Sequence, residues 1–139
     1  MKLITRNTDY AIRALCYIAE QKQEIISADR LVKSLEIPRP FLRKILQTLT
    51  KAGLLNSSKG KDGGFSLAVS PEEITLIEVM KIFQGPIRLS EHKFKKNDCP
   101  HIKDCLLKKK IDEIEKEVIA KLKAITISSI LKKEVKVND

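Results

Sequence analysis

Two prolines, Pro38 and Pro40, most constrain how this chain can fold, because neither can lie in the interior of a regular helix. Proline is tolerated at the first position of a helix, where its missing N–H group removes no hydrogen bond. We therefore predict a helix within residues 39–51, with Pro40 at its first position and its end before Gly53. Apolar residues recur along it at the spacing of one helical face: Phe41, Leu42, Ile45, Leu46 and Leu49.

A shorter helix is predicted just before this one. Ser27 is a suitable N-cap, and Leu31 and Leu35 follow at helical spacing before Pro38 ends the segment. Two helices joined by a tight turn are typical of a helix-turn-helix motif, in which the second helix enters the major groove of DNA. Residues 39–51 are the predicted recognition helix.

The other face of the predicted recognition helix is basic and polar. It carries Arg39, Arg43, Lys44, Gln47, Thr48 and Lys51. No acidic residue occurs from residue 37 to residue 61, and the whole chain has a net charge of +9, from 27 Lys and Arg against 18 Asp and Glu. Such a block neutralises phosphates and releases counterions. The alternative is a solvated basic face without a partner, but its coincidence with a helix-turn-helix favours DNA binding.

Residues 54–58 and 65–69 are predicted to form two short strands around a glycine-rich turn. Lys59 and Lys61 lie in this turn, where they can enter a minor groove or bind a phosphate. The pattern is that of a wing. A nucleotide-binding loop is disfavoured, because the terminal Gly-Lys-Ser/Thr is absent and a strand follows the turn instead of a helix.

Four further helices complete the predicted fold, which is mainly α with a small β-wing. The first spans residues 9–21 with Thr8 as N-cap, and another begins after Thr75 and ends at Gly85. A long helix runs from residue 106 to about residue 123, and Thr126 caps a short one that ends at residue 131. The chain thus divides into a winged helix-turn-helix unit (1–84), a loop (85–105) and a helical C-terminal part (106–139).

The long helix has a narrow apolar seam, whose members are Leu107, Ile111, Ile114, Val118, Leu122 and Ile125. Such a seam suits one partner helix, so we expect two copies of the chain to pair through it. The alternative is that the seam packs onto its own domain.

The loop holds Cys99, His101 and Cys105, and thiolates favour zinc or the iron of an iron–sulfur cluster over hard cations. Zinc, iron–sulfur and two unpaired thiols all remain open from the spacing. Cys16 adjoins the apolar face of the first helix and is expected to fill the core. We find no nucleophile and base pairing, so we expect no enzyme and no small-molecule substrate. No apolar run approaches the about 18 residues of a membrane span, and we expect a cytoplasmic protein without a membrane partner.

The order of these parts resembles the dimeric winged-helix regulators of the IscR and NsrR type, bacterial sensors of iron–sulfur status, nitric oxide or redox state. The residues that carry the likeness are 3–11, 37–49, 59–67, 78–79, 99–105 and 122–131. The resemblance implies a cytoplasmic homodimer whose recognition helices bind successive major grooves of a pseudo-palindromic double-stranded DNA operator.

The resemblance also implies a set of cluster ligands. Cluster-bearing members of the family usually have three cysteines; Cys99 and Cys105 match the second and third, and the first falls at Lys93. His92 stands beside it as a nitrogen donor, and Asp9 matches a ligand that some members take from the partner subunit. His101 competes with His92. We favour a [2Fe–2S] over a [4Fe–4S] cluster, and the alternative is a clusterless regulator controlled by a thiol switch or by a partner enzyme of sulfur metabolism.

Overall fold

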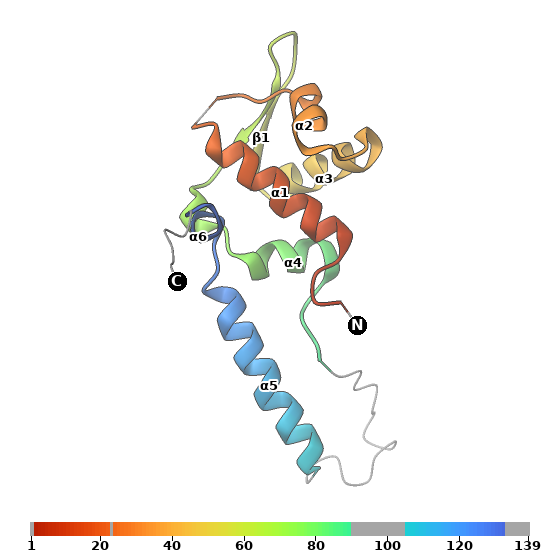
Figure 1. The fold of residues 1–139 in the computed structure, drawn as a ribbon, viewed down its shortest axis with the longest axis vertical. Coiled ribbons are helices and arrows are strands. Elements are labelled where there is room, and N and C mark those ends of the chain that lie inside the picture. The colour runs from red at the N-terminus through yellow and green to blue at the C-terminus, as the bar shows by residue number, and fades with distance from the viewer. Residues whose placement is uncertain (1, 23, 90–104, 133–139) are drawn as a thin grey trace, which may run out of the picture.

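The computed structural model describes residues 2–22, 24–89 and 105–132 (Figure 1). Along these residues the elements are, in order, α1 (Arg6–Glu20), α2 (Ala28–Leu35), α3 (Arg39–Lys51), β1 (Leu55–Ser58), β2 (Gly64–Leu67), the 3₁₀ helix η1 (Pro71–Glu73), α4 (Leu76–Gln84), α5 (Leu106–Lys123) and α6 (Ile127–Leu131). The two strands form one antiparallel sheet. The predicted class, mainly helical with a small β-wing, is confirmed. None of the described helices is long and apolar enough to cross a membrane.

The central element is α1, whose Ala11, Ala14 and Leu15 are fully buried. The helices α3, α4 and α6 pack around it. Thr5 is its N-cap, so the prediction of Thr8 in that role was wrong. Thr8 lies in the first turn with none of its surface exposed, because its hydroxyl donates to Gln84 Oε1 in α4 at 2.7 Å.

The helices α2 and α3 form the predicted helix-turn-helix. Ser27 caps α2 by accepting a hydrogen bond from the Arg30 N–H at 3.1 Å. Glu36 ends that helix in the left-handed region (φ 54°), and Pro38 is the N-cap of α3. Since α3 begins at Arg39, Pro40 is its second residue and not, as predicted, its first.

A polar cluster holds α2 against α1. The Tyr17 hydroxyl accepts hydrogen bonds from Ser34 Oγ and from Arg30 Nε, each at 3.1 Å. The hydrogen bond from Ser34 is the largest cause that lowers the pKa of Tyr17, and Arg30 contributes in the same direction. The first helix of the helix-turn-helix is thus fixed to the central helix by side chains that the apolar pattern does not include.

The wing lies where the sequence predicted it, with strand ends shifted by one or two residues. Leu55 stands opposite Leu67 and Ser58 opposite Gly64. Two backbone hydrogen bonds join the wing to the segment before α2: the Ile26 N–H donates to the Phe65 carbonyl at 2.9 Å, and the Phe65 N–H donates to the Ile26 carbonyl at 2.8 Å. The wing and the helix-turn-helix therefore form one unit.

The helix α5 extends away from the rest of the molecule, with its N-terminal end farthest out (Figure 1). Its seam is divided. Leu122 is buried and Val118 partly buried against α4, whereas Leu107 and Ile114 are 70% and 49% exposed. The C-terminal half of the seam thus packs onto its own chain, as the alternative had it. In the N-terminal half Ile111 is partly buried, whereas Leu107 and Ile114 are exposed.

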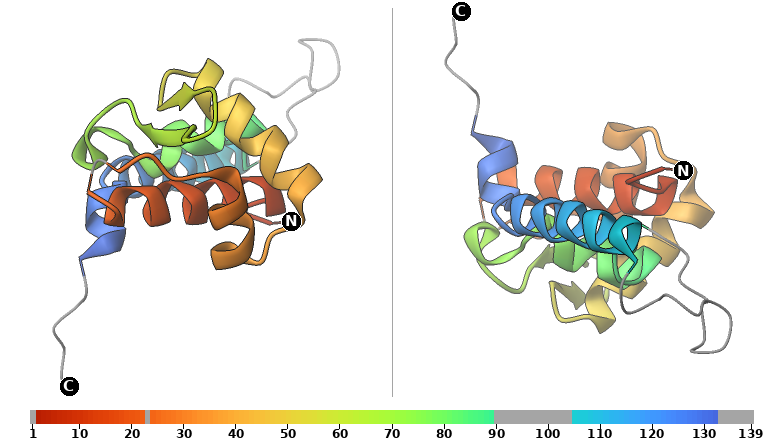
Figure 2. Two further views of the ribbon diagram at one scale, coloured as in Figure 1. Left: turned by 90° about the horizontal axis from the view of Figure 1, so that it is seen from above. Right: turned by 90° about the horizontal axis from the view of Figure 1, so that it is seen from below.

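The helix α6 folds back against α1 (Figure 2). Thr126 caps it, as predicted, and Ile127 is buried in the main core. The Ile127 N–H donates to the Ile74 carbonyl at 2.9 Å, and the Leu76 N–H donates to the Ile125 carbonyl at 2.8 Å. These bonds tie the end of α5 to the start of α4. The division into residues 1–84, 85–105 and 106–139 stays a prediction.

Candidate nucleic-acid interface

A polar ridge runs along α3. Arg43, Lys44, Gln47 and Lys51 are exposed, while Leu42, Ile45, Leu46 and Leu49 of the same helix are buried. This division follows from the 3.6-residue period of the helix, which places the buried and exposed sets on opposite faces. The predicted recognition helix therefore presents its basic side to solvent.

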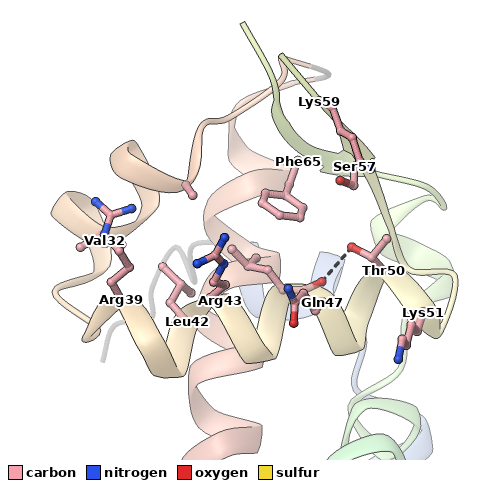
Figure 3. A pocket seen from close by; sticks show the side chains of 12 residues that line it. Val32, Arg39, Leu42, Arg43, Gln47, Thr50, Lys51, Ser57, Lys59 and Phe65 are labelled. Atoms are coloured by element: carbon pink, nitrogen blue, oxygen red, sulfur yellow. Dashed lines mark hydrogen bonds between the residues drawn. The ribbon is translucent and has the colours of Figure 1, made fainter. Parts of the chain in front are cut away.

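A groove lies between this ridge, α2 and the wing (Figure 3). Its lining residues are Ala28, Val32, Arg39, Leu42, Arg43, Leu46, Gln47, Thr50, Lys51, Ser57, Lys59 and Phe65. Five of the seven predicted DNA-binding residues are brought together here, and none of the described residues that line the groove is acidic. Lys44 lies on the other side of α3, and Lys61 is exposed in the turn of the wing.

Arg39 is not free at the edge of the groove. Its Nη2 lies 2.6 Å from Asp29 Oδ1 in the first turn of α2, and both side chains are more than half exposed. This pair links the start of the recognition helix to α2. Asp29 was not predicted as part of the site. Its contact with a base ten residues later depends on the conformation of the turn between α2 and α3, which the sequence pattern does not reveal.

Phe41 is not part of the core, so its predicted place on the buried face was wrong. It is 41% exposed, and the Arg6 guanidinium lies over its ring at 4.9 Å from the centroid. The first turn of α1 supplies this cation, which explains how an aromatic side chain on α3 remains near the surface.

The proposed metal ligands are only partly within the described residues. Cys105 is the N-cap of α5, where its half-buried Sγ accepts a hydrogen bond from the Lys108 N–H at 3.4 Å. Asp9 Oδ2 lies 3.2 Å from Arg13 Nε. His92, Cys99 and His101 lie outside the described residues. Within residues 2–22, 24–89 and 105–132, no group of three potential ligands is close enough to hold a metal ion.

Cys16 is half-buried against the main core, as predicted. Burial raises the pKa of its thiol to about 11, and the nearby Glu20 carboxylate adds to the effect. Such a thiol is protonated at neutral pH, which makes it a poor nucleophile and a poor metal ligand.

The structure also describes how the cysteine-bearing segment is attached to the rest of the chain. Before it, Gln84 closes α4 with three hydrogen bonds: it accepts from the Thr5 N–H and the Thr8 hydroxyl, and it donates to the Leu3 carbonyl at 2.8 Å. A few residues later, the Leu89 N–H donates to Glu115 of α5 at 2.9 Å. The segment therefore starts from a point that contacts both α1 and α5.

Comparison with known proteins identifies the family. A family model described as Rrf2, an iron-dependent transcriptional regulator, matches residues 4–133, nearly the whole chain. This chain belongs to the Rrf2 family. The resemblance to regulators of the IscR and NsrR type is therefore confirmed at the level of the family.

Three similar proteins match this chain along more than nine tenths of their own lengths. The HTH-type transcriptional regulator NsrR of Halalkalibacterium halodurans is 32% identical over 133 residues, which cover 94% of this chain and 91% of that protein. CymR, titled the global cysteine regulator of B. subtilis, superimposes with a TM-score of 0.76 at 21% identity, covering 94% of this chain and 97% of CymR. IscR of T. potens gives a TM-score of 0.75 at 20% identity, covering 100% and 93%. At these identities the two solved structures show a shared fold.

Membership of the Rrf2 family settles the broad function. The chain is a DNA-binding transcription regulator of winged-helix fold, and it is not an enzyme. Both predictions are confirmed.

Proposed function

We propose that this chain is a homodimeric regulator that binds a pseudo-palindromic operator through α3 and the wing, and whose affinity is controlled through Cys99 and Cys105. The observation that carries the first part is the groove, in which side chains of α3 and the wing converge without an acidic residue in the lining. An α-helix of 10–12 Å diameter fits a DNA major groove of about 12 Å, and the wing reaches the adjacent backbone or minor groove.

The basic and polar side chains of α3 and the wing are proposed to contact different parts of the DNA. Arg43 and Gln47 stand mid-helix on the exposed ridge, where an arginine can bind guanine and a glutamine can bind adenine at two points. Lys51 and Lys59 stand at the end of α3 and on the wing, where they meet phosphates, and Lys61 at the wing tip reaches the minor groove. Arg39, held by Asp29, reads a base near the start of the helix.

The N-terminal half of the α5 seam is the proposed dimer contact. Leu107 and Ile114 are large apolar side chains that stay exposed in one subunit. Burying them against a second copy is favourable by roughly 25 cal/mol per Å² of apolar surface. A dimer also places two recognition helices at the half-site spacing of a palindromic operator.

Cys99 and Cys105 are the proposed thiolate ligands of an iron–sulfur cluster. His92 of the same subunit and Asp9 of the partner subunit are the proposed weaker donors. Cys105 suits this role, because its thiol is half-buried and in no disulfide. Asp9 is engaged by Arg13, but exposed ion pairs are worth only about 0–1 kcal/mol, so exchange is inexpensive. When bound, the cluster would supply a redox-sensitive centre with a [2Fe–2S] composition favoured.

Cys105 can pass a change at its sulfur directly to the dimer contact. Its Sγ caps the first turn of α5, and Leu107 lies in that same turn. Ligation, oxidation or release of the sulfur changes the partner available to the Lys108 N–H and thereby the order of the turn. The signal is iron–sulfur status, redox state or nitric oxide.

A second candidate is control by the thiols themselves, without a cluster. It is favoured by the free Cys105 thiol and by Lys93 at the place of the first family cysteine. The shared fold with CymR, titled a cysteine regulator, agrees with it. The visible spectrum of anaerobically purified protein distinguishes the two candidates: charge-transfer bands lost in Cys99→Ala and Cys105→Ala support the cluster, and a colourless protein contradicts it.

DNA binding is tested with a duplex selected by the wild-type protein from a random pool. Arg43→Ala and Gln47→Ala should each reduce discrimination between bases by about 1–3 kcal/mol. Lys51→Ala should instead weaken binding to all sequences and flatten its salt dependence. Lys81→Ala on α4 is the control with the same charge change. Unchanged affinity and selectivity in all three α3 variants would contradict the proposal.

A further inference from the structure

A second hollow lies beside α3, on the side away from the groove. It is lined by Arg6 and Asn7 of α1, Phe41, Lys44, Ile45 and Thr48 of α3, and Phe83 of α4. It shares no residue with the groove between α3 and the wing. At 3.6 residues per turn, Phe41, Ile45 and Thr48 of the hollow lie roughly opposite the groove residues of α3, whereas Lys44 lies on the exposed ridge between the two.

Two cations meet at this hollow. The Arg6 guanidinium is held over the Phe41 ring at 4.9 Å, and Lys44 stands one turn further along α3. Both are exposed, and neither forms a salt bridge with a described residue. Among the described residues, no acidic side chain lines the hollow, and the nearest acid along α1, Asp9, is paired with Arg13. The hollow is therefore a site for an anion.

The shape of DNA identifies that anion. A helix lying in a major groove has one phosphate backbone on each of its sides, because the groove is about as wide as the helix. In the proposed mode of binding, Lys59 on the wing meets one of these backbones. On the opposite side, Arg6 and Lys44 occupy the corresponding place. The α1 residues were not among those that the sequence pattern assigned to DNA.

We propose that Arg6, held by Phe41 and supported by Lys44, binds a backbone phosphate of the DNA strand opposite the wing, so that α1 and the wing clamp α3 in the major groove. This inference rests on the proposed mode of DNA binding. Stacking on Phe41 restricts the guanidinium without using its N–H donors, which stay available for a phosphate. Phe41 is thus a positioning residue, and its exposure on the DNA side has a function.

The test measures the affinity of Arg6→Gln, Lys44→Gln and Arg6→Lys for the selected duplex at salt concentrations from about 50 to about 300 mM. Over this range the dependence of log K on log salt gives a slope for each variant. Loss of one phosphate contact should lower the slope of log K against log salt by roughly 0.9 and weaken binding about 5- to 20-fold at low salt. Arg6→Lys keeps the charge and should retain the slope. Lys81→Gln is the control for net charge, and thermal unfolding of each variant checks the fold.

Single methylphosphonate substitutions in the duplex locate the contact. One neutralised phosphate on the strand opposite the wing should weaken wild-type binding but have little further effect on Arg6→Gln. Equal losses for the wild type and Arg6→Gln at every phosphate would overturn the inference. Lys59→Gln distinguishes failure of the α1 contact from failure of the proposed mode of DNA binding. If the slope is flattened in Lys59→Gln but unchanged in Arg6→Gln, the α1 contact alone is refuted. If neither variant changes the slope, the proposed mode of binding is refuted.

Discussion

Gly64 marks the closest approach of the wing to the helix-turn-helix, and its replacement by alanine should break that junction. A Cβ atom at Gly64 would lie 2.2 Å from the Ile26 carbonyl oxygen, 2.5 Å from the Ile26 carbonyl carbon and 2.9 Å from the Ser27 nitrogen. All three are backbone atoms, and ordinary contact begins at 3.4 Å, so the strand must retreat by about 1 Å. The retreat pulls apart the two hydrogen bonds between Ile26 and Phe65.

The cost follows from these contacts. Each backbone hydrogen bond contributes about 1 kcal/mol, and a forced overpacking costs about 1–3 kcal/mol. We expect Gly64→Ala to lower the free energy of unfolding by about 3–5 kcal/mol, a large part of the 5–15 kcal/mol typical of a domain. The folded fraction should also bind DNA more weakly, because the wing no longer lies beside α3.

Urea unfolding at equilibrium measures the effect, with Gly60→Ala as the matched control. Gly60 lies at the wing tip with a positive φ (107°) and no atom within 4 Å of an added Cβ. Its replacement should cost only the strain of the backbone, about 1–2 kcal/mol. If Gly64→Ala were no more destabilised than Gly60→Ala, the close packing of the wing against the Ile26 backbone would be wrong.

Three further predictions concern other parts of the chain. Leu107→Glu with Ile114→Glu should give a folded monomer by light scattering, since both side chains are largely exposed in one subunit; a dimer of unchanged mass would place the contact elsewhere. Gln84→Leu should lower the free energy of unfolding by about 2–3 kcal/mol, because the buried Thr8 hydroxyl loses its acceptor, and a loss under about 0.5 kcal/mol would contradict this. The raised pKa of Cys16 predicts that the alkylation rate of its thiol increases up to a pH of about 11. The protonated thiol should contribute fully to the stability of the folded protein below pH 9, and this contribution should fall as the pH rises toward 11. An alkylation rate that levels off at pH 9, as for a free thiol, would refute the burial.

Local patterns were sufficient to predict the helix-turn-helix and the wing. Proline at the start of α3, its apolar spacing and the glycine-rich turn act over a few residues, so no distant contact is needed to recognise them. The bounds of α5 and the end of α3 came out as predicted for the same reason, and the start of α3 differed from its predicted place by one residue.

The errors arose where a distant partner decides. Thr8 looked like an N-cap, but Gln84, 76 residues away in sequence, gives its hydroxyl a buried partner and leaves the cap to Thr5. Phe41 matched the apolar spacing of α3, but Arg6 of another helix holds it near the surface. The apolar seam of α5 looked uniform, because the spacing of its apolar residues does not reveal how far along α5 the contact with α4 extends.

The candidate site was predicted in part for the same reasons. Exposed basic residues on one helix face are visible in the sequence, and five of the seven assigned to DNA line the groove. Asp29 and Arg6 were missed, because each acts through a contact between elements. The ligands proposed around Cys99 remain a prediction, since Cys99, His92 and His101 lie outside the described residues.

We propose that the chemistry of Cys99 and Cys105 sets the affinity of this regulator for DNA. The most direct measurement is the dissociation constant for the selected duplex, by fluorescence anisotropy, of anaerobically purified protein before and after controlled oxidation. We expect the affinity of the wild type to change at least tenfold and that of the Cys99→Ala, Cys105→Ala double variant to stay constant, with Cys16→Ala responding as the wild type does. An affinity that is the same in both states of the wild type, or a double variant that still responds, would contradict the account.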